Sequence, residues 1–331
     1  MVFLTSSEQA ASVACIEALQ LVDGLILWTA GGHADPWNHV ETAMALDVGG
    51  SHDAARAAYG WLRDNQRADG SWHQYYTANS VKDPKFDANT IAYIAAGAWH
   101  HWLCTGDTDW LASMWPTIHS AISWVLELQQ PTGEILWARE PDGTPFHYAL
   151  ITGSSSIHHS LRSAVAIAGQ LGHDSSVWLA AQDLLCHALC EHPLEFFAEK
   201  DRWAMDWYYP VLGGIHIGAA GEVQLQKRWD DFVIAGEGVR CVNDHPWVTT
   251  GETAEAAIAC AVAGLWGEAA ELFATTAKLR FEDGSYWTGL HIPTRTNFPE
   301  GERTAYSAAS VLLANAVLTG HQPTRSLFAI Q

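Results

Sequence analysis

The chain has 331 residues and a mass of 36.2 kDa, and its composition is 48% hydrophobic and 16% charged, with 17 Trp, 9 Tyr and 10 Phe. This apolar content excludes an intrinsically disordered chain, and the absence of a short repeat excludes collagen-like classes. The formal net charge of −20 argues against a nucleic-acid partner, because a polyanion would be repelled. The longest apolar stretch carries Glu17 and Asp23, so we expect an amphipathic helix there and no membrane span.

Helical patterns recur along the chain, whereas strand patterns are scarce. Gly49 and Gly50 are typical of a helix end, and Ser51 and Asp174 are typical N-caps. In chain order we predict helices over about residues 7–24, 39–48, 52–66, 87–103, 108–129, 155–171, 175–197, 203–217, 224–234, 250–264, 266–280 and 303–318.

These twelve segments alternate between two kinds. Segments of one kind are amphipathic, and they begin near residues 8, 52, 108, 175, 224 and 266. Segments of the other kind are rich in Ala, Ser and Gly and apolar nearly all round, as buried helices are, and they begin near residues 39, 87, 155, 203, 250 and 303. The alternation predicts an all-α fold, an (α/α)₆ toroid of six helical hairpins with an inner and an outer ring. With no linker in the sequence, we expect a single domain over residues 1–331.

The cysteines and the start of the chain bear on its compartment. The six cysteines lie mostly in helical patterns, which indicates small buried side chains in a reducing environment and not a disulfide framework. Cys186, His187 and Cys190 share a helix without a second ligand pair, so we expect no metal and no cofactor. The first residues lack a signal-peptide pattern, and we therefore expect a cytoplasmic protein.

In such a toroid the long loops and the N-termini of all inner helices meet at one end, where function is expected to concentrate. These segments combine carboxylates with Trp, Tyr and His, which is typical of a sugar site: aromatic faces stack on a pyranose while polar groups bind its hydroxyls. The candidate substrate-binding residues are Trp37, Trp72, His73, Tyr75, Trp137, Arg139, Trp207, Tyr208, Arg240, Asp244, Trp247, Trp287, Arg303 and Tyr306.

Asp87 and Glu252 are the favoured catalytic pair. They open the second and fifth inner helices, which lie opposite each other in a six-hairpin ring, so the carboxyl groups could lie about 6.5–9.5 Å apart, as in inverting glycosidases. Glu41 and Asp206 are the next candidates, followed by Glu140. The alternative is that an acid in a first helical turn only caps or stabilises its helix.

Two stretches resemble the middle region of six-hairpin glycosidases of the glucoamylase kind: TGDTDWLASMWPTIHSAISWVLE and TGEILWAREPDGTPFHYALITGSSS. The closing GERTAYSAASVLLANAVL is similar to the last inner helix of that family. The resemblance implies a glycosidase. Glucoamylases place their general acid directly after the Trp of this loop, whereas here Ala138 follows Trp137 and the nearest carboxylate is Glu140.

QRADGSW, residues 66–72, is similar to the Q-x-x-x-G-x-W repeat of triterpene cyclases and of protein prenyltransferase β subunits, with partial copies at QQPTGEILW and FEDGSYW. In the cyclases this motif is structural, so it implies a toroid and not a reaction. The acid motif of the cyclases and the zinc ligands of the prenyltransferases have no counterpart in the sequence.

The sequence therefore predicts a glycoside hydrolase that acts on a terminal glycosidic bond of a small-molecule or oligosaccharide substrate, by inverting carboxylate acid/base catalysis. Two alternatives remain open at this point. One is an isoprenoid enzyme of the terpene cyclase or prenyltransferase kind, whose aromatic pocket would stabilise carbocations. The other is a sugar-binding toroid without catalytic activity.

Overall fold

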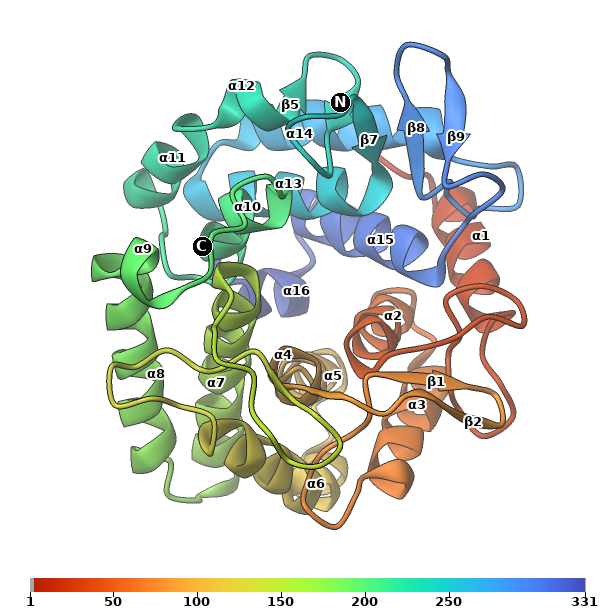
Figure 1. Ribbon diagram of the computed structural model, residues 1–331. Helices are drawn as coiled ribbons and strands as arrows, with labels where there is room; N and C mark the ends of the chain where they lie inside the picture. The colour runs from red at the N-terminus through yellow and green to blue at the C-terminus, as the bar shows by residue number, and fades with distance from the viewer. Residues whose placement is uncertain (1–2, 331) are drawn as a thin grey trace.

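The computed structural model describes residues 3–330, which form two concentric rings of helices (Figure 1). The inner ring consists of α2 (Pro36–Val48), α4 (Ala88–Ala92) with α5 (Ile94–Thr105), α7 (Ile151–Leu171), α10 (Ala204–Leu212), α13 (Thr250–Ala263) and α15 (Ala305–Thr319). The outer ring consists of α1 (Ser6–Glu17), α3 (His52–Asn65), α6 (Thr108–Leu126), α8 (Ser176–Glu191), α11 (Ala219–Gln226) and α14 (Trp266–Thr275). Each inner helix contacts the next, and α15 contacts α2, so the inner ring is closed. The predicted (α/α)₆ toroid is confirmed.

Composition explains which helices lie inside. In α13 thirteen of the fourteen residues are buried, and most of them are Ala or other small residues that let neighbouring helices approach on every side. In α3 only Ala55, Ala58, Tyr59, Trp61 and Leu62 are buried, which form one stripe, while charged residues occupy the opposite face.

Several predicted helices differ from the observed ones. The predicted helices 175–197, 203–217 and 266–280 end early, at Glu191, Leu212 and Thr275. Turns interrupt three others. The first ends at Glu17, since a turn around Gly24 follows it. The fourth is divided at Tyr93 into α4 and α5. The predicted helix 224–234 is instead the end of α11, a short α12 (Trp229–Phe232) and a strand.

Within residues 3–330, nine short strands organise the long loops at the end of the ring where the inner helices begin. They are β1 (Tyr75–Thr77), β2 (Ser80–Asp83), β3 (Phe86–Asp87), β4 (Ala138–Arg139), β5 (Val233–Ile234), β6 (Gly238–Val239), β7 (Trp247–Thr249), β8 (Gly289–His291) and β9 (Thr296–Phe298). Strand β3 pairs with β4 and runs directly into α4, and β7 pairs with β8 and runs into α13. These pairings position the first residues of two opposite inner helices.

The Q-x-x-x-G motif joins neighbouring outer helices. The Gln66 Nε2 atom donates to the carbonyls of Gly70 and of Thr117 on α6, and Gln20 and Gln129 make equivalent pairs of bonds. Gly70 has a φ of +94°, and a Cβ atom there would lie 2.4 Å from the Ser120 carbonyl oxygen. Trp72 is fully buried, and its indole donates to the Leu62 carbonyl at 2.9 Å. The motif is therefore structural in this chain.

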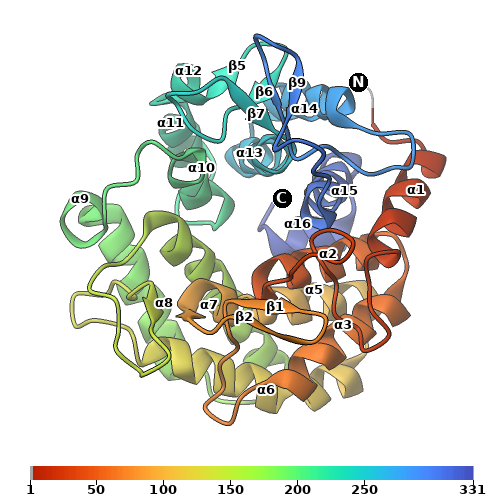
Figure 2. The ribbon, with the colours of Figure 1, turned by 45° about the vertical axis from the view of Figure 1, so that its right-hand side comes forward.

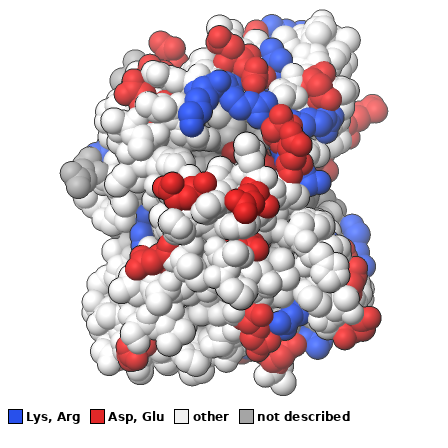
Figure 3. All heavy atoms as spheres, turned by 60° about the vertical axis from the view of Figure 1, so that its left-hand side comes forward, with Lys and Arg blue, Asp and Glu red and all other residues white. Residues whose placement is uncertain are grey.

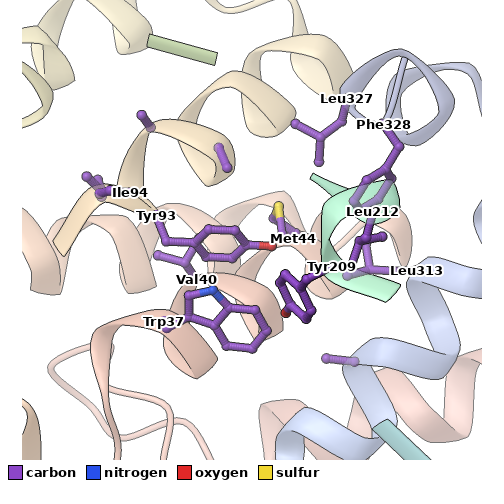
Figure 4. Packing of buried hydrophobic residues seen from close by; sticks show 14 of the residues in the cluster. Trp37, Val40, Met44, Tyr93, Ile94, Tyr209, Leu212, Leu313, Leu327 and Phe328 are labelled. Carbon is purple, nitrogen blue, oxygen red and sulfur yellow. The ribbon is translucent and has the colours of Figure 1, made fainter. Parts of the chain in front are cut away.

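The far end of the ring is closed by the C-terminal segment. Helix α16 (Gln322–Leu327) follows α15 and packs against α5, and Phe328 stacks on His159 at a centroid distance of 5.4 Å. Arg162 donates to the Leu327 carbonyl at 2.7 Å. Side chains from several inner helices converge between this closure and the opposite end (Figure 4). Further short helices are α9 (Pro193–Phe196) and the 3₁₀ turn η1 (Thr276–Leu279).

Acidic and basic side chains are interspersed on one face of the molecule. On the face shown in Figure 3, Lys and Arg form only small groups among Asp and Glu, with no continuous basic stripe. Within residues 3–330 no helix is long and apolar enough to cross a lipid bilayer.

Candidate active site

A cavity of about 450 Å³ opens where the inner helices begin. All six inner helices contribute residues from, or immediately before, their first turns. The cavity is lined by Trp28, Asp35, Trp37, Asn38, Gln74, Tyr75, Asp87, Asn89, Thr90, Thr152, Trp203, Met205, Tyr209, Cys241, Thr249, Glu252, Thr288, Phe298, Pro299, Glu302, Thr304 and Tyr306. Four carboxylates and a wall of aromatic side chains therefore face one space.

Asp87 is the N-cap of α4. Its Oδ1 atom accepts the backbone N–H groups of Asn89 and Thr90 at 2.9 and 3.2 Å, and its Oδ2 atom accepts the Trp137 indole N–H at 2.5 Å. Strand β4 brings Trp137 into place, because Ala138 pairs with Asp87. Burial raises the pKa of Asp87 to about 6 against the opposing effect of these donors.

Glu252 lies in the first turn of α13, the inner helix opposite α4 in the ring. It lines the same cavity as Asp87, so the structure brings together the two residues favoured from sequence. Burial raises the pKa of Glu252, and the neighbouring Thr249 hydroxyl partly opposes this shift.

Asp35 repeats the arrangement of Asp87 on α2. It caps that helix through the Asn38 backbone N–H at 2.9 Å, while its Oδ2 atom accepts the Trp28 indole N–H at 2.8 Å and the Asn38 amide at 2.7 Å. Burial raises the pKa of Asp35. Its place before an inner helix was noticeable in the sequence, but it was not among the catalytic candidates.

Glu302 is the fourth carboxylate of the cavity, and sequence reasoning missed it. It lies in the loop before α15 and accepts the Thr288 hydroxyl at 2.9 Å. No helical or strand pattern surrounds it, so its only signal was its position directly before Arg303 and the last inner helix.

A second layer of acids lies beneath the cavity. Glu41, on α2, accepts the Tyr93 hydroxyl at 2.7 Å, and Glu255, one turn after Glu252, accepts the Tyr208 and Tyr209 hydroxyls. Burial raises the pKa of Glu41 to about 7 and that of Glu255 to about 8, the latter with a contribution from the Glu41 charge. Of the tyrosines that these acids bind, Tyr209 lines the cavity, and the two acids do not line it themselves.

Aromatic rings form much of the cavity wall. Trp37 stacks on Tyr93 at 4.8 Å and lies edge-on to Tyr306 at 5.7 Å, and Figure 4 shows Trp37 and Tyr93 side by side. Trp247 lies behind the wall, where it stacks on Phe298 at 4.5 Å. Trp203 lies on the rim, with 47% of its surface exposed.

Of the residues predicted from sequence, Asp87, Glu252, Trp37, Tyr75 and Tyr306 line the cavity, and Trp137 contacts it through Asp87. Asp206 instead accepts the Thr152 backbone N–H and hydroxyl from behind the wall, and Glu140 is exposed on a loop. Neither lines the cavity.

The remaining predicted binding residues do not line it either, because each is engaged elsewhere. Buried side chains that pack in the core are Trp72, Trp207 and Tyr208. Residues held by loop or ion-pair contacts outside the cavity are His73, Arg139, Arg240, Asp244, Trp287 and Arg303.

One cluster of side chains has the composition of a metal site. Its members, however, are hydrogen-bonded to one another and to Arg56. Asp47, His52 and His101 lie together at the opposite end of α2. The Arg56 Nε–H group donates to His101 Nε2, so the proton of a neutral His101 ring is on Nδ1, which donates to Asp47 at 2.8 Å. The cluster is thus an Arg–His–Asp hydrogen-bond chain.

All six cysteines are free thiols.

Comparison with known proteins identifies the family of the chain. It is 45% identical over 325 residues to an MMP endo-(1,4)-3-O-methyl-alpha-D-mannosidase from Mycolicibacterium hassiacum, covering 98% of this chain and 90% of that protein. The chain belongs to the family of this endo-mannosidase. It is a glycoside hydrolase. No protein-family model matches the sequence.

Solved structures of low sequence identity share the fold. They include a glycosidase variant in complex with glucose, with a TM-score of 0.73 and 15% identity over 96% of this chain and 99% of that one. A GH63 mannosylglycerate hydrolase from Thermus thermophilus has a TM-score of 0.71 and 12% identity over 92% and 99%. A D-mannose isomerase has a TM-score of 0.70 and 10% identity over 95% and 97%.

The family assignment favours the glycosidase prediction over the isoprenoid and non-catalytic alternatives. The coarser part of the first resemblance, a glycosidase toroid, is confirmed, although the identified relative is an endo-mannosidase and not a glucoamylase.

Proposed function

We propose that the protein cleaves internal α-(1,4) bonds between 3-O-methyl-D-mannose units of an oligosaccharide. The observation that carries this proposal is the 45% identity to an enzyme named for that activity, over nearly the whole chain. The sequence alone favoured a terminal bond, whereas the name of the relative specifies endo action. The single-domain organisation and the cytoplasmic location stay predictions.

Glu252 acts as the general acid and Asp87 as the general base. Burial raises the pKa of Glu252, and its protonated form donates a proton to the leaving oxygen. Asp87 is held by three N–H donors, and these orient a carboxylate that removes a proton from the attacking water. Their positions on opposite inner helices support an inverting reaction, in which the water lies between the acid and base.

Asp35 and Glu302 bind sugar hydroxyls. Each is anchored by a protein donor, Asp35 by Trp28 and Asn38 and Glu302 by Thr288, so its remaining lone pairs accept hydrogen bonds from the substrate. Such anchored acceptors fix the orientation of a pyranose ring within the cavity.

The apolar part of the wall suits a methyl ether, which cannot donate a hydrogen bond. Met205, Phe298 and Pro299 lie among the lining residues and offer apolar surface to an O-methyl group, while Trp37 and Tyr306 offer ring faces to the pyranose. Methylated and unmethylated mannose should therefore differ in their affinity for this cavity.

The test is product analysis by mass spectrometry after incubation of the purified protein with α-(1,4)-linked 3-O-methylmannose oligosaccharides. Unmethylated α-(1,4)-mannose oligosaccharides are the matched control. Early products of intermediate length, formed only from the methylated chain, are the expected result. Release of single units from one end contradicts endo action, and equal cleavage of both chains contradicts the assigned substrate.

A further inference from the structure

A second hollow of about 710 Å³ lies beside the candidate active site. We call it the side groove, and it lies between the segment after α8 and the segment from α10 to α12. Figure 2 shows these two sets of helices on neighbouring parts of the rim. The residues used below are Ile151, Leu194, Lys200 and Asp206, all of which line it.

The side groove and the cavity share a wall. Ile151 lines the side groove and the next residue, Thr152, lines the cavity; Met205 lines the cavity and the next residue, Asp206, lines the side groove. The wall is held by Asp206 Oδ1, which accepts the Thr152 backbone N–H at 3.1 Å and the Thr152 hydroxyl at 2.5 Å. The two hollows are thus separated by the thickness of one hydrogen-bonded pair of residues.

The side groove offers both kinds of contact that a methylated sugar uses. Leu194 has 91% of its surface exposed there, which gives an apolar face for a pyranose ring or a methyl ether. Lys200 lies close enough to Asp206 for its charge to lower the pKa of that carboxyl, and within residues 3–330 it forms no ion pair. Its ammonium group is therefore available to a hydroxyl or ether oxygen.

We propose that the side groove binds the part of the oligosaccharide that extends beyond the cavity, as a distal subsite for methylated hexose units. This inference rests on the proposed endo activity, because an enzyme that cleaves internal bonds holds substrate units on both sides of the bond. The C-terminal segment closes the far end of the ring, so an extended chain leaves the cavity across the rim. The shared wall at Thr152 and Asp206 is where such a chain passes into the side groove.

The experiment compares kcat/KM for short and long α-(1,4)-linked 3-O-methylmannose oligosaccharides. The variants are Leu194→Ser and Lys200→Ala, and Val22→Ser is the matched control, since Val22 is exposed and lines neither hollow. Melting temperatures confirm folding, and all three changes are at exposed positions.

For the long substrate we expect kcat/KM to fall about tenfold in each groove variant, because each variant loses one polar or apolar contact. For the short substrate we expect kcat/KM to change by less than about twofold. Equal effects on both lengths, or no effect in either variant, overturn the side-groove proposal. Failure of the unmodified protein to cleave either length overturns the proposed function instead.

Discussion

The indole Nε1–H of Trp137 donates to the Oδ2 atom of Asp87 at 2.5 Å, although the two residues are 50 positions apart. The short pairing of β3 with β4 creates this contact, since it places Ala138 opposite Asp87 and lets Ala88 N–H bond to the Trp137 carbonyl. A loop that resembles the acid-bearing loop of glucoamylases thus delivers a hydrogen-bond donor here, and the carboxylate comes from the start of α4, the preceding inner helix.

Loss of this donor should alter the pH dependence of the reaction. The Trp137 N–H lowers the pKa of Asp87, so Trp137→Phe should raise that pKa above about 6. A general base must be ionised, and the acidic limb of the kcat/KM profile should therefore move to higher pH, with a rate loss of about tenfold at acidic pH and a small loss at neutral pH. Trp102→Phe is the control, because the Trp102 indole donates to the Thr108 hydroxyl and does not line the cavity. An unmoved acidic limb would argue against Asp87 as the base.

The stereochemical course follows from the same pair. An inverting reaction on an α-linked substrate releases the β-anomer first, and ¹H NMR during the first minutes of hydrolysis distinguishes it from the α-anomer. Initial formation of the α-anomer would show a retaining enzyme and remove the role of Asp87 as a base for water.

The buried acid Glu255 should make the folded state less stable as the pH rises. Its pKa is about 8 when folded and 4.5 ordinarily, so the native state binds more protons than the unfolded state between these values, and stability falls across that window. Glu255→Gln cannot ionise and keeps polar partners for Tyr208 and Tyr209. The free energy of unfolding of this variant should exceed that of the unmodified protein by an amount that grows to roughly 2–4 kcal/mol by pH 8.5.

Thermal unfolding from pH 5 to 9 measures this effect, with the exposed Glu282→Gln as the control. A stability difference that does not change with pH would mean that Glu255 is ionised in the folded protein. Activity provides a second readout, because the Glu255 charge contributes to the environment of Tyr209 at the cavity floor.

The close approach of Gly70 to α6 and its positive φ both affect stability, and two substitutions separate the two effects. Gly70→Ala should destabilise the fold by about 2–4 kcal/mol, because the new Cβ atom would meet the Ser120 backbone at a φ of +94°. Gly143 has a φ of +88° with no atom within 4 Å of a Cβ, so Gly143→Ala should cost only about 1–2 kcal/mol. Equal losses in denaturant unfolding would contradict the contact.

Sequence periodicity was sufficient for the double ring because burial on all sides requires small residues throughout a helix, as in α13. It placed Asp87 and Glu252 correctly in one cavity because both lie within one turn of an inner-helix start. The helix interruption at Tyr93 and the short strands escaped it. The pairings of β3 with β4 and of β7 with β8 join segments far apart in the sequence, which no local pattern reveals.

Some predicted binding residues in the loops lie outside the cavity while a neighbouring residue lines it. Trp287 and Arg303 point outward, whereas the adjacent Thr288 and Glu302 line the cavity. In extended backbone neighbouring side chains point to opposite sides, so a loop assigned correctly still leaves a choice between alternate residues. Aromatic and cationic residues were chosen for their chemistry, and the structure presents their neighbours instead.

The most direct test of the account is the turnover of α-(1,4)-linked 3-O-methylmannose oligosaccharides by Asp87→Asn and Glu252→Gln. Glu140→Gln, which changes an exposed carboxylate of the same loop end, is the matched control. The account predicts a loss of about 10³-fold in kcat for both cavity variants and full activity in the control. The melting temperatures of both cavity variants should show that they are folded. Turnover at the unmodified rate by both cavity variants would contradict it.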